Sequence, residues 1–289
     1  MNAKSSSIRL CAFADEASAD RHGQIAALSQ NRISLLEMRG VDGINVAGLS
    51  AAVAKTFKKE LDDAGIGVWS IGSPVGKSPI TQDFSVEKEQ FERLLDTAHI
   101  TGASCMRIFS FYGTDGSQAC FDEVCYRLDV FCDMAKGSGV NLCHENEKGI
   151  FGDTAPRCLA LHKALPRLKA VFDPANFIQC GQDVMQAWDS LAPHVWYGHI
   201  KDAAGDGSIV PPGEGVGRLR EYLPLFAALA KEGKNSGVLT LEPHLAEFVG
   251  LAGLENRGER SVVGGCRFES ERAAFDHAAK CLSDILKTF

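Results

Sequence analysis

Short apolar runs alternate with amphipathic stretches along this chain of 289 residues. In the amphipathic stretches, apolar residues recur three or four positions apart, which is typical of one face of an α-helix. The apolar runs between them predict β-strands, each followed by a helix. The eight runs occupy residues 8–14, 33–39, 67–72, 105–111, 140–147, 170–173, 195–199 and 238–242.

The spacing of these runs favours one fold over its competitor. They recur about every 30 residues, the size of a βαβ unit, and Gly65, Gly102 and Gly137 stand where helices would end. Eight parallel strands close most simply into an α/β (β/α)8 TIM barrel, which needs about 250 residues. A doubly wound open sheet would usually carry a glycine-rich turn after the first strand, and residues 14–17 lack one. We therefore expect a single barrel domain spanning residues 1–289.

Polar side chains appear where the last four expected strands end. They are Glu145, Asp173, His199 and Glu242. The C-terminal ends of barrel strands form one rim, which holds the active site in enzymes of this fold. One carboxylate at a strand end is more often a helix cap or an ion-pair partner. Four such groups on consecutive strands instead predict one divalent metal ion, such as Mn, Mg, Co or Zn.

Further polar residues at the same rim are candidates for binding a substrate. We expect these contacts from Glu37, Arg107, Asn176 and Lys201. For Arg107 and Lys201 the alternative is an ion pair with Glu37, Glu147 or Asp202. The irregular segment at residues 246–268 is a candidate lid, or a simple surface excursion. Cysteines are not expected to be ligands, and Cys143 is expected to face away from Glu145.

Composition excludes several classes of function. The formal net charge of −7 argues against a nucleic-acid partner, because phosphate binding usually leaves a basic footprint. No run is long enough to cross a membrane, and the first residues lack the apolar segment of a secretory signal. The ten cysteines are scattered without a CxxC pair, which indicates reduced thiols in the cytoplasm rather than a disulfide framework. A homo-oligomer is possible from the sequence, without a feature that selects it.

Five short motifs, in this order, carry a resemblance to a known family. They are His144-Glu145-Asn146-Glu147, Phe172-Asp173-Pro174-Ala175-Asn176, His199-Ile200-Lys201-Asp202, Pro212-Gly213-Glu214-Gly215 and Leu241-Glu242-Pro243. Together they resemble the xylose isomerase-like superfamily of TIM barrels (sugar phosphate isomerase/epimerase). This superfamily includes ketose 3-epimerases, hydroxypyruvate isomerase-like proteins, inosose and dehydroshikimate dehydratases, and endonuclease IV. The resemblance runs over nearly the whole chain.

The resemblance implies a site and a reaction. It implies that Glu145, Asp173, His199 and Glu242 ligate one divalent metal, and that Glu145 and Glu242 also move protons. The chain departs from the epimerase pattern at two positions: Asn176 stands where those enzymes commonly have histidine, and Gly205 where they have arginine. Substrate contacts are therefore expected to differ.

The expected function is a metal-dependent isomerase or epimerase in carbohydrate metabolism. Its substrate would be a sugar, polyol or keto-sugar, and its carboxylates would transfer protons through a metal-stabilised enediolate. A dehydratase of the inosose or dehydroshikimate type is the first alternative. An endonuclease IV-like hydrolase would need extra histidines on the early strands, which end without them. A non-catalytic sugar-binding barrel is the last alternative.

Overall fold

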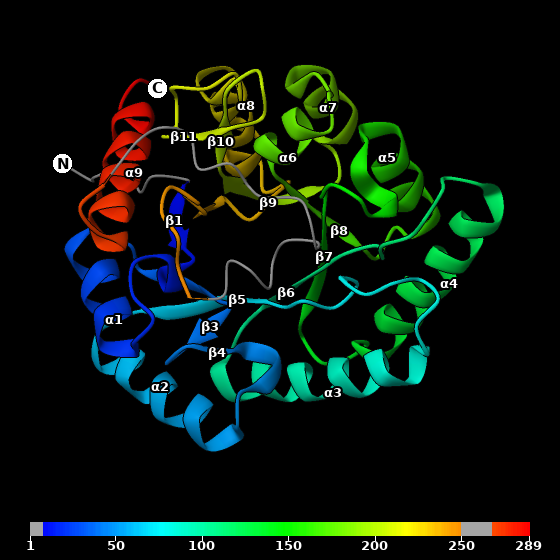
Figure 1. Ribbon diagram of the computed structural model, residues 1–289, viewed down its shortest axis with the longest axis horizontal. Helices are drawn as coiled ribbons and strands as arrows, with labels where there is room; N and C mark the ends of the chain where they lie inside the picture. Colours follow the sequence, from blue (N-terminus) through cyan, green and yellow to red (C-terminus); the bar gives the residue numbers. More distant parts are fainter. Residues whose placement is uncertain (1–7, 250–267) are drawn as a thin grey trace.

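Eight parallel strands close into a barrel at the centre of the computed structural model, which describes residues 8–249 and 268–289 (Figure 1). Around the barrel the strands follow the order β1-β12-β9-β8-β7-β6-β5-β2, with β2 pairing again with β1. Their bounds are β1 Arg9–Ala12, β2 Leu35–Met38, β5 Gly67–Gly72, β6 Cys105–Ile108, β7 Asn141–Glu145, β8 Lys169–Phe172, β9 Val195–Ile200 and β12 Val238–Leu241. The predicted (β/α)8 TIM barrel and all eight of its strands are confirmed.

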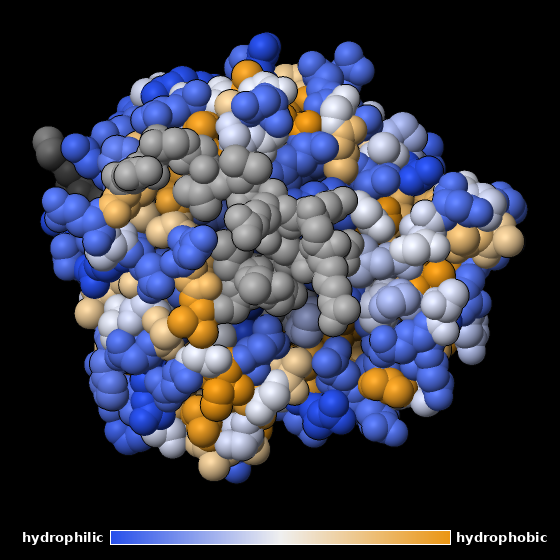
Figure 2. Space-filling model, in the orientation of Figure 1, coloured by the Kyte–Doolittle hydropathy of each residue, from blue (hydrophilic) through white to orange (hydrophobic). Residues whose placement is uncertain are grey.

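Helices surround the barrel, as Figure 1 shows. They are α1 Arg21–Gln30, α2 Ala51–Asp63, α3 Phe84–Thr101, α4 Gln118–Met134, α5 Ala155–Ala164, α6 Pro174–Gln179, α7 Val184–Leu191, α8 Leu219–Lys231 and α9 Glu271–Leu286, with short 3-10 helices η1 Ala14–Glu16, η2 Val46–Gly48 and η3 Phe151–Asp153. Side chains of Ser50, Ser117 and Asp183 accept hydrogen bonds from the first turns of α2, α4 and α7. Hydrophilic residues predominate over the outer helices (Figure 2).

Two small hairpins follow barrel strands at the C-terminal rim. The first pairs β3 Gly40–Val41 with β4 Ile44–Asn45, and the second pairs β10 Asp202–Ala203 with β11 Ile209–Val210. A glycine-rich loop over residues 211–217 follows the second hairpin. The carboxylate of Asp202 holds that loop in place by accepting hydrogen bonds from the backbone N–H groups of Gly213 at 2.8 Å and Gly217 at 2.9 Å.

The interior of the barrel is filled by side chains in layers. A lower apolar layer comes from all but one of the strands and consists of Cys11, Trp69, Cys105, Cys143, Val171, Tyr197 and Val238. Glu145 follows Cys143 by two positions, and residues two apart on a strand share a face. The expectation that Cys143 faces away from Glu145 is therefore wrong: both point inward, one layer apart.

Other features of the described residues complete the picture. The described helices include none that is both long and apolar enough to cross a membrane. The structure joins none of the nine cysteines within the described ranges in a disulfide. Most of the candidate lid falls on residues 250–267, which lie outside the described residues.

Candidate metal centre

The four predicted ligands meet at the C-terminal rim. Glu145 ends β7, Asp173 follows β8, His199 lies in β9 and Glu242 follows β12, and these four strands are consecutive neighbours in the barrel. One ligand atom from each residue lies within 4.8 Å of every other. All four side chains are buried. The barrel thus brings together the groups that the sequence places at separate strand ends.

Three carboxylates in one buried cluster need positive charge nearby, and the structure supplies it from side chains. His199 Nδ1 lies 3.0 Å from Glu145 Oε1 and 3.2 Å from Glu242 Oε2. Lys201 Nζ lies 2.8 Å from Asp173 Oδ2. A ring nitrogen directed between carboxylate oxygens is a donor set that suits a divalent cation. The residues therefore fit the metal that the sequence predicts.

The second ring nitrogen of His199 faces a buried carboxylate. Nε2 lies 3.3 Å from Glu37 Oε2, and Glu37 is completely buried. The hydroxyls of Tyr197 at 2.8 Å and Thr240 at 2.9 Å also donate to Glu37. Metal-binding histidines commonly donate their other N–H to such a carboxylate, which fixes the ring and its tautomer. The structure thus places Glu37 behind His199.

Burial and charge shift the pKa values of these groups in different directions. Burial would lower the pKa of His199, but Glu145 and Glu37 outweigh it and raise that pKa well above its ordinary value. Burial raises the pKa of Asp173 to about 6. Burial also acts to raise the pKa of Glu145, yet His199 and Arg107 lower it to about 2. A cation that binds here must displace the His199 proton.

A polar cavity with an empty volume of about 400 Å³ opens over these residues. Two of the ligand carboxylates, Glu145 and Glu242, reach its surface. The cavity is lined by Lys77, Arg107, Glu145, Glu147, Lys148, Asn176, Gln179, Lys201, Ile209, Glu242 and His244. A small polar molecule in it would touch both glutamates.

Residues 33–261 match the model of a known protein family, the xylose isomerase-like TIM barrel. The chain belongs to this family. No curated protein sequence matches the chain at a significant level. Membership agrees with the motifs that carry the resemblance, since all five lie within the matched residues.

Solved structures of similar fold cover nearly all of the chain. A probable 3-DHS dehydratase, AsbF from Bacillus anthracis, has a TM-score of 0.70 at 15% identity, covering 96% of this chain and 99% of its own. The IOLI protein with a bound zinc atom has a TM-score of 0.73 at 14% identity, covering 98% and 99%. The D-psicose 3-epimerase of Clostridium cellulolyticum H10, solved with D-tagatose, has a TM-score of 0.71 at 15% identity, covering 97% and 99%. At these identities the likeness shows the fold.

Three predicted substrate residues of this family member line the cavity and also contact the ligand set. Arg107 Nη1 lies 2.9 Å from Glu145 Oε2. The Asn176 amide donates to Glu145 Oε1 at 3.3 Å. Lys201 lies 3.4 Å from Glu242 Oε2 as well as beside Asp173. The ion pairs of Arg107 and Lys201 are thus formed with the proposed ligands themselves. Glu37, the fourth predicted residue, is absent from the lining of this cavity.

A network around Arg39 extends the site beyond what the sequence analysis assigns. The Arg39 guanidinium contacts Asp15 Oδ2 at 2.9 Å, Glu16 Oε1 at 3.0 Å and Glu242 Oε1 at 3.1 Å. His244 joins it, with its backbone N–H donating to Glu16 Oε2 at 2.7 Å and its backbone at a positive φ of 48°. Asp15 and Glu16 directly follow the first strand, and this position could have predicted that they belong to the site.

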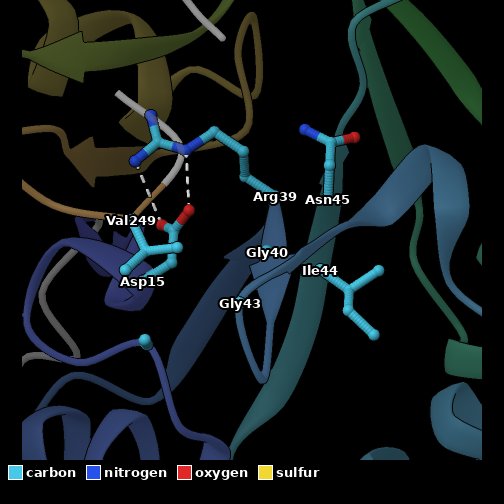
Figure 3. Close-up of a pocket in the computed structure, with 8 residues that line it drawn as sticks. Asp15, Arg39, Gly40, Gly43, Ile44, Asn45 and Val249 are labelled. Carbon is cyan, nitrogen blue, oxygen red and sulfur yellow. Dashed lines mark hydrogen bonds and ion pairs between the residues drawn. The ribbon is translucent and has the colours of Figure 1, made fainter. Parts of the chain in front are cut away.

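Arg39 also borders a second cavity, with an empty volume of about 350 Å³. Figure 3 shows the guanidinium reaching across to Asp15, with Ile44 and Asn45 on the β3–β4 hairpin and Val249 close to Asp15. Around Arg39, Glu16, Glu242 and His244 form another group of possible metal ligands, and Glu242 and His244 line the first cavity rather than the second. Glu242 belongs to both groups, and the first offers four ligand residues against three, so we assign the metal to the first cluster.

Proposed function

We propose that this protein is a divalent-metal-dependent enzyme that isomerises or epimerises a sugar, polyol or keto-sugar. The observation that carries the proposal is the position of two glutamates, Glu145 and Glu242, which come from the two outer strands of the four and both reach the surface of the same cavity. Two carboxylates that flank one substrate can remove a proton and return it at another face or carbon.

The metal has a defined part in this proposal. Glu145, Asp173, His199 and Glu242 would hold it, and a bound divalent ion polarises a carbonyl and makes the neighbouring C–H more acidic. The oxygen-rich donor set with one imidazole suits Mn, Mg, Co or Zn. The bound zinc of the IOLI protein, a neighbour in fold, is consistent with this choice.

Each glutamate is held in its ionised form, the form that can remove a proton. Glu145 is anchored through one oxygen by Arg107, and Glu242 through one oxygen by Arg39. The surrounding cations and His199 outweigh burial and lower the pKa of both carboxyl groups. The other oxygen of each glutamate faces His199 at the centre. That central oxygen would hold the metal, so we assign proton transfer to the second oxygen of each glutamate.

The remaining polar residues bind and position in this proposal. Arg107, Asn176 and Lys201 line the cavity, where their N–H groups can donate to substrate oxygens. Glu37 is a positioning residue that fixes the His199 ring from behind. Solved neighbours in the family fold include epimerases with a ketohexose present, which supports a carbohydrate substrate.

A deuterium-exchange screen tests the proposal. The manganese-loaded protein is incubated in heavy water with ketoses, inososes and hydroxy-acids, and each product is examined by NMR. We expect deuterium at the carbon beside the carbonyl, and loss of the exchange when the metal is chelated. A loaded protein that exchanges no proton in any of these compounds would contradict the proposal.

The same screen distinguishes an isomerase from a dehydratase. The dehydratase is the alternative because the probable dehydratase AsbF has a similar fold. A dehydratase would remove the same proton and then expel a β-hydroxyl group. Its product would be lighter by one water and would contain a new carbon–carbon double bond. Exchange with retention of all hydroxyl groups supports the isomerase, whereas stoichiometric loss of water assigns the dehydratase.

A further inference from the structure

Cationic side chains outnumber carboxylates in the wall of the metal cavity. Four permanently cationic side chains line it, Lys77, Arg107, Lys148 and Lys201, against three glutamates. Two of those glutamates are proposed metal ligands, so their charge is neutralised when a divalent ion binds. The third is Glu147, which pairs with Lys77 at 2.9 Å. A substrate in the loaded cavity therefore faces a surplus of positive charge.

Lys148 is the clearest source of that surplus. Its side chain is half-buried in the cavity wall. Within residues 8–249 and 268–289, no carboxylate forms an ion pair with it under 4.0 Å. The adjacent Glu147 accepts the backbone N–H of Lys148 but directs its other oxygen to Lys77. An ammonium group in the wall of a cavity can donate charge-assisted hydrogen bonds to an anion bound there.

Lys77 lies on the same side of the rim as Lys148. Lys77 follows β5 and Lys148 follows β7, with β6 between these strands in the barrel. The Lys77 ammonium also lies 4.5 Å from the centre of the Phe109 ring, which restrains it at the cavity wall. Both lysines line the cavity that reaches Glu145 and Glu242. One molecule can therefore meet the lysines at one end and the metal centre at the other.

We propose that the substrate carries an acidic group, a carboxylate or a phosphate, which binds to Lys148 with help from Lys77 while its carbonyl end lies at the metal centre. This inference rests on the proposed function, because it assigns a substrate class to the same site. Charge-assisted hydrogen bonds from two ammonium groups distinguish such a substrate from a neutral sugar of the same size.

Binding of matched pairs to the manganese-loaded protein tests this inference without requiring turnover. The pairs are D-fructose with D-fructose 6-phosphate, and D-glucose with D-glucuronate, titrated by calorimetry at low salt. We expect the acidic member of at least one pair to bind roughly tenfold tighter or more, as one charged hydrogen bond contributes. The first pair reports a phosphate and the second a carboxylate.

Lysine variants identify the group responsible. Lys148→Met should remove the preference for the acidic member and leave manganese affinity unchanged. The matched control is Lys136→Met, an exposed lysine just before β7 and thus at the opposite end of the barrel, which should keep the preference. Equal binding within both pairs would overturn the inference, and so would a preference that survives in Lys148→Met.

The outcomes also separate this inference from the proposed function. If neutral sugars exchange deuterium and acidic compounds bind no more tightly, the acidic substrate is contradicted and the isomerase proposal is supported. A lysine-dependent preference without proton exchange in any compound would keep the acidic ligand and remove the isomerase.

Discussion

Two neighbouring layers inside the barrel have opposite chemistry although the same strands build them. The lower layer contains Cys143, Val171 and Tyr197, and the upper one contains Glu145, Asp173 and His199, each two residues further along its strand. In the lower layer burial raises the pKa of the Cys143 thiol well above its ordinary value, so the thiol stays neutral. In the upper layer neighbouring charges keep Glu145 ionised despite burial.

The difference teaches how this barrel separates stability from chemistry. The lower layer is packed from uncharged side chains, so it stabilises the closed barrel and holds the strands at fixed spacing. The upper layer concentrates charge that is compensated by a few named partners. Substitutions in the lower layer should therefore change the free energy of unfolding, and substitutions in the upper layer should change metal binding and turnover.

The largest effect is expected from the two glutamates of the upper layer. Replacing Glu145 or Glu242 with Gln removes the base while keeping the shape, so turnover at saturating metal should fall by about a thousandfold or more. Steady-state kinetics with an active compound from the exchange screen measures it. Glu89→Gln on the exposed side of α3 is the control, with activity unchanged. Full activity in either of the two glutamate variants would remove its proton-transfer role.

The next effect concerns the residue between the layers. Glu37→Gln weakens the carboxylate partner of His199 Nε2, and loss of such a partner typically lowers metal affinity about 10–100-fold. Manganese titration by calorimetry measures the change. The control is Glu87→Gln, which replaces another buried glutamate. Glu87 accepts a hydrogen bond of 2.9 Å from the Gly76 N–H and contacts none of the metal ligands, so this variant should leave the manganese affinity unchanged. Equal affinities in the two variants would show that Glu37 does not position His199.

Metal affinity should also depend on pH, and it should decrease as the pH falls because the ligands of the upper layer take up protons. The raised pKa of His199 means that its proton must leave before a cation binds. Affinity should therefore fall by about tenfold for each unit of pH decrease near neutrality. Below the Asp173 pKa of about 6 a second proton competes, and the fall should steepen. Titrations in buffers of different ionisation enthalpy count the released protons. A pH-independent affinity would contradict the ligand assignment.

The smallest functional effect is expected in the lower layer. Val171→Ala leaves a small cavity beneath Asp173 and should cost about 2 kcal/mol of unfolding free energy, measured by denaturant titration. Manganese affinity should stay within about threefold of the original, since the site and its charges are unchanged. Asp173→Asn, two residues later, should show the reverse pattern: lost metal affinity with little loss of stability. Similar profiles for the two variants would remove the separation between the layers.

The sequence predicted the barrel because each of its strands carries a local signal. Every barrel strand is an apolar run, and the ends at Glu145, Asp173, His199 and Glu242 fall where the fold must gather them. Short elements escaped prediction: α6 has six residues, and the hairpin strands have two each. Such elements depend on tertiary contacts rather than on a repeated pattern. One example is the Asp202 carboxylate, which binds backbone N–H groups of the loop after β11.

The Arg39 network could not be predicted for a different reason. Arg39 meets Glu242 only because the barrel closes, with β1 pairing with both β2 and β12. Residues some 200 positions apart then share one charge cluster, and no spacing in the sequence reports that. The contact between Glu37 and His199 could not be predicted for the same reason. It depends on the relative heights of β2 and β9 in the closed barrel, which the sequence does not give.

The most direct test of the account is a crystal structure of the protein soaked with manganese, with the ion located by its anomalous scattering. We predict one strong peak in direct contact with Glu145, Asp173, His199 and Glu242, with His199 bound through Nδ1. A peak held instead by Glu16 and His244, or by the exterior group Glu214, His277 and Cys281, with none at the four predicted ligands, would contradict the central claim.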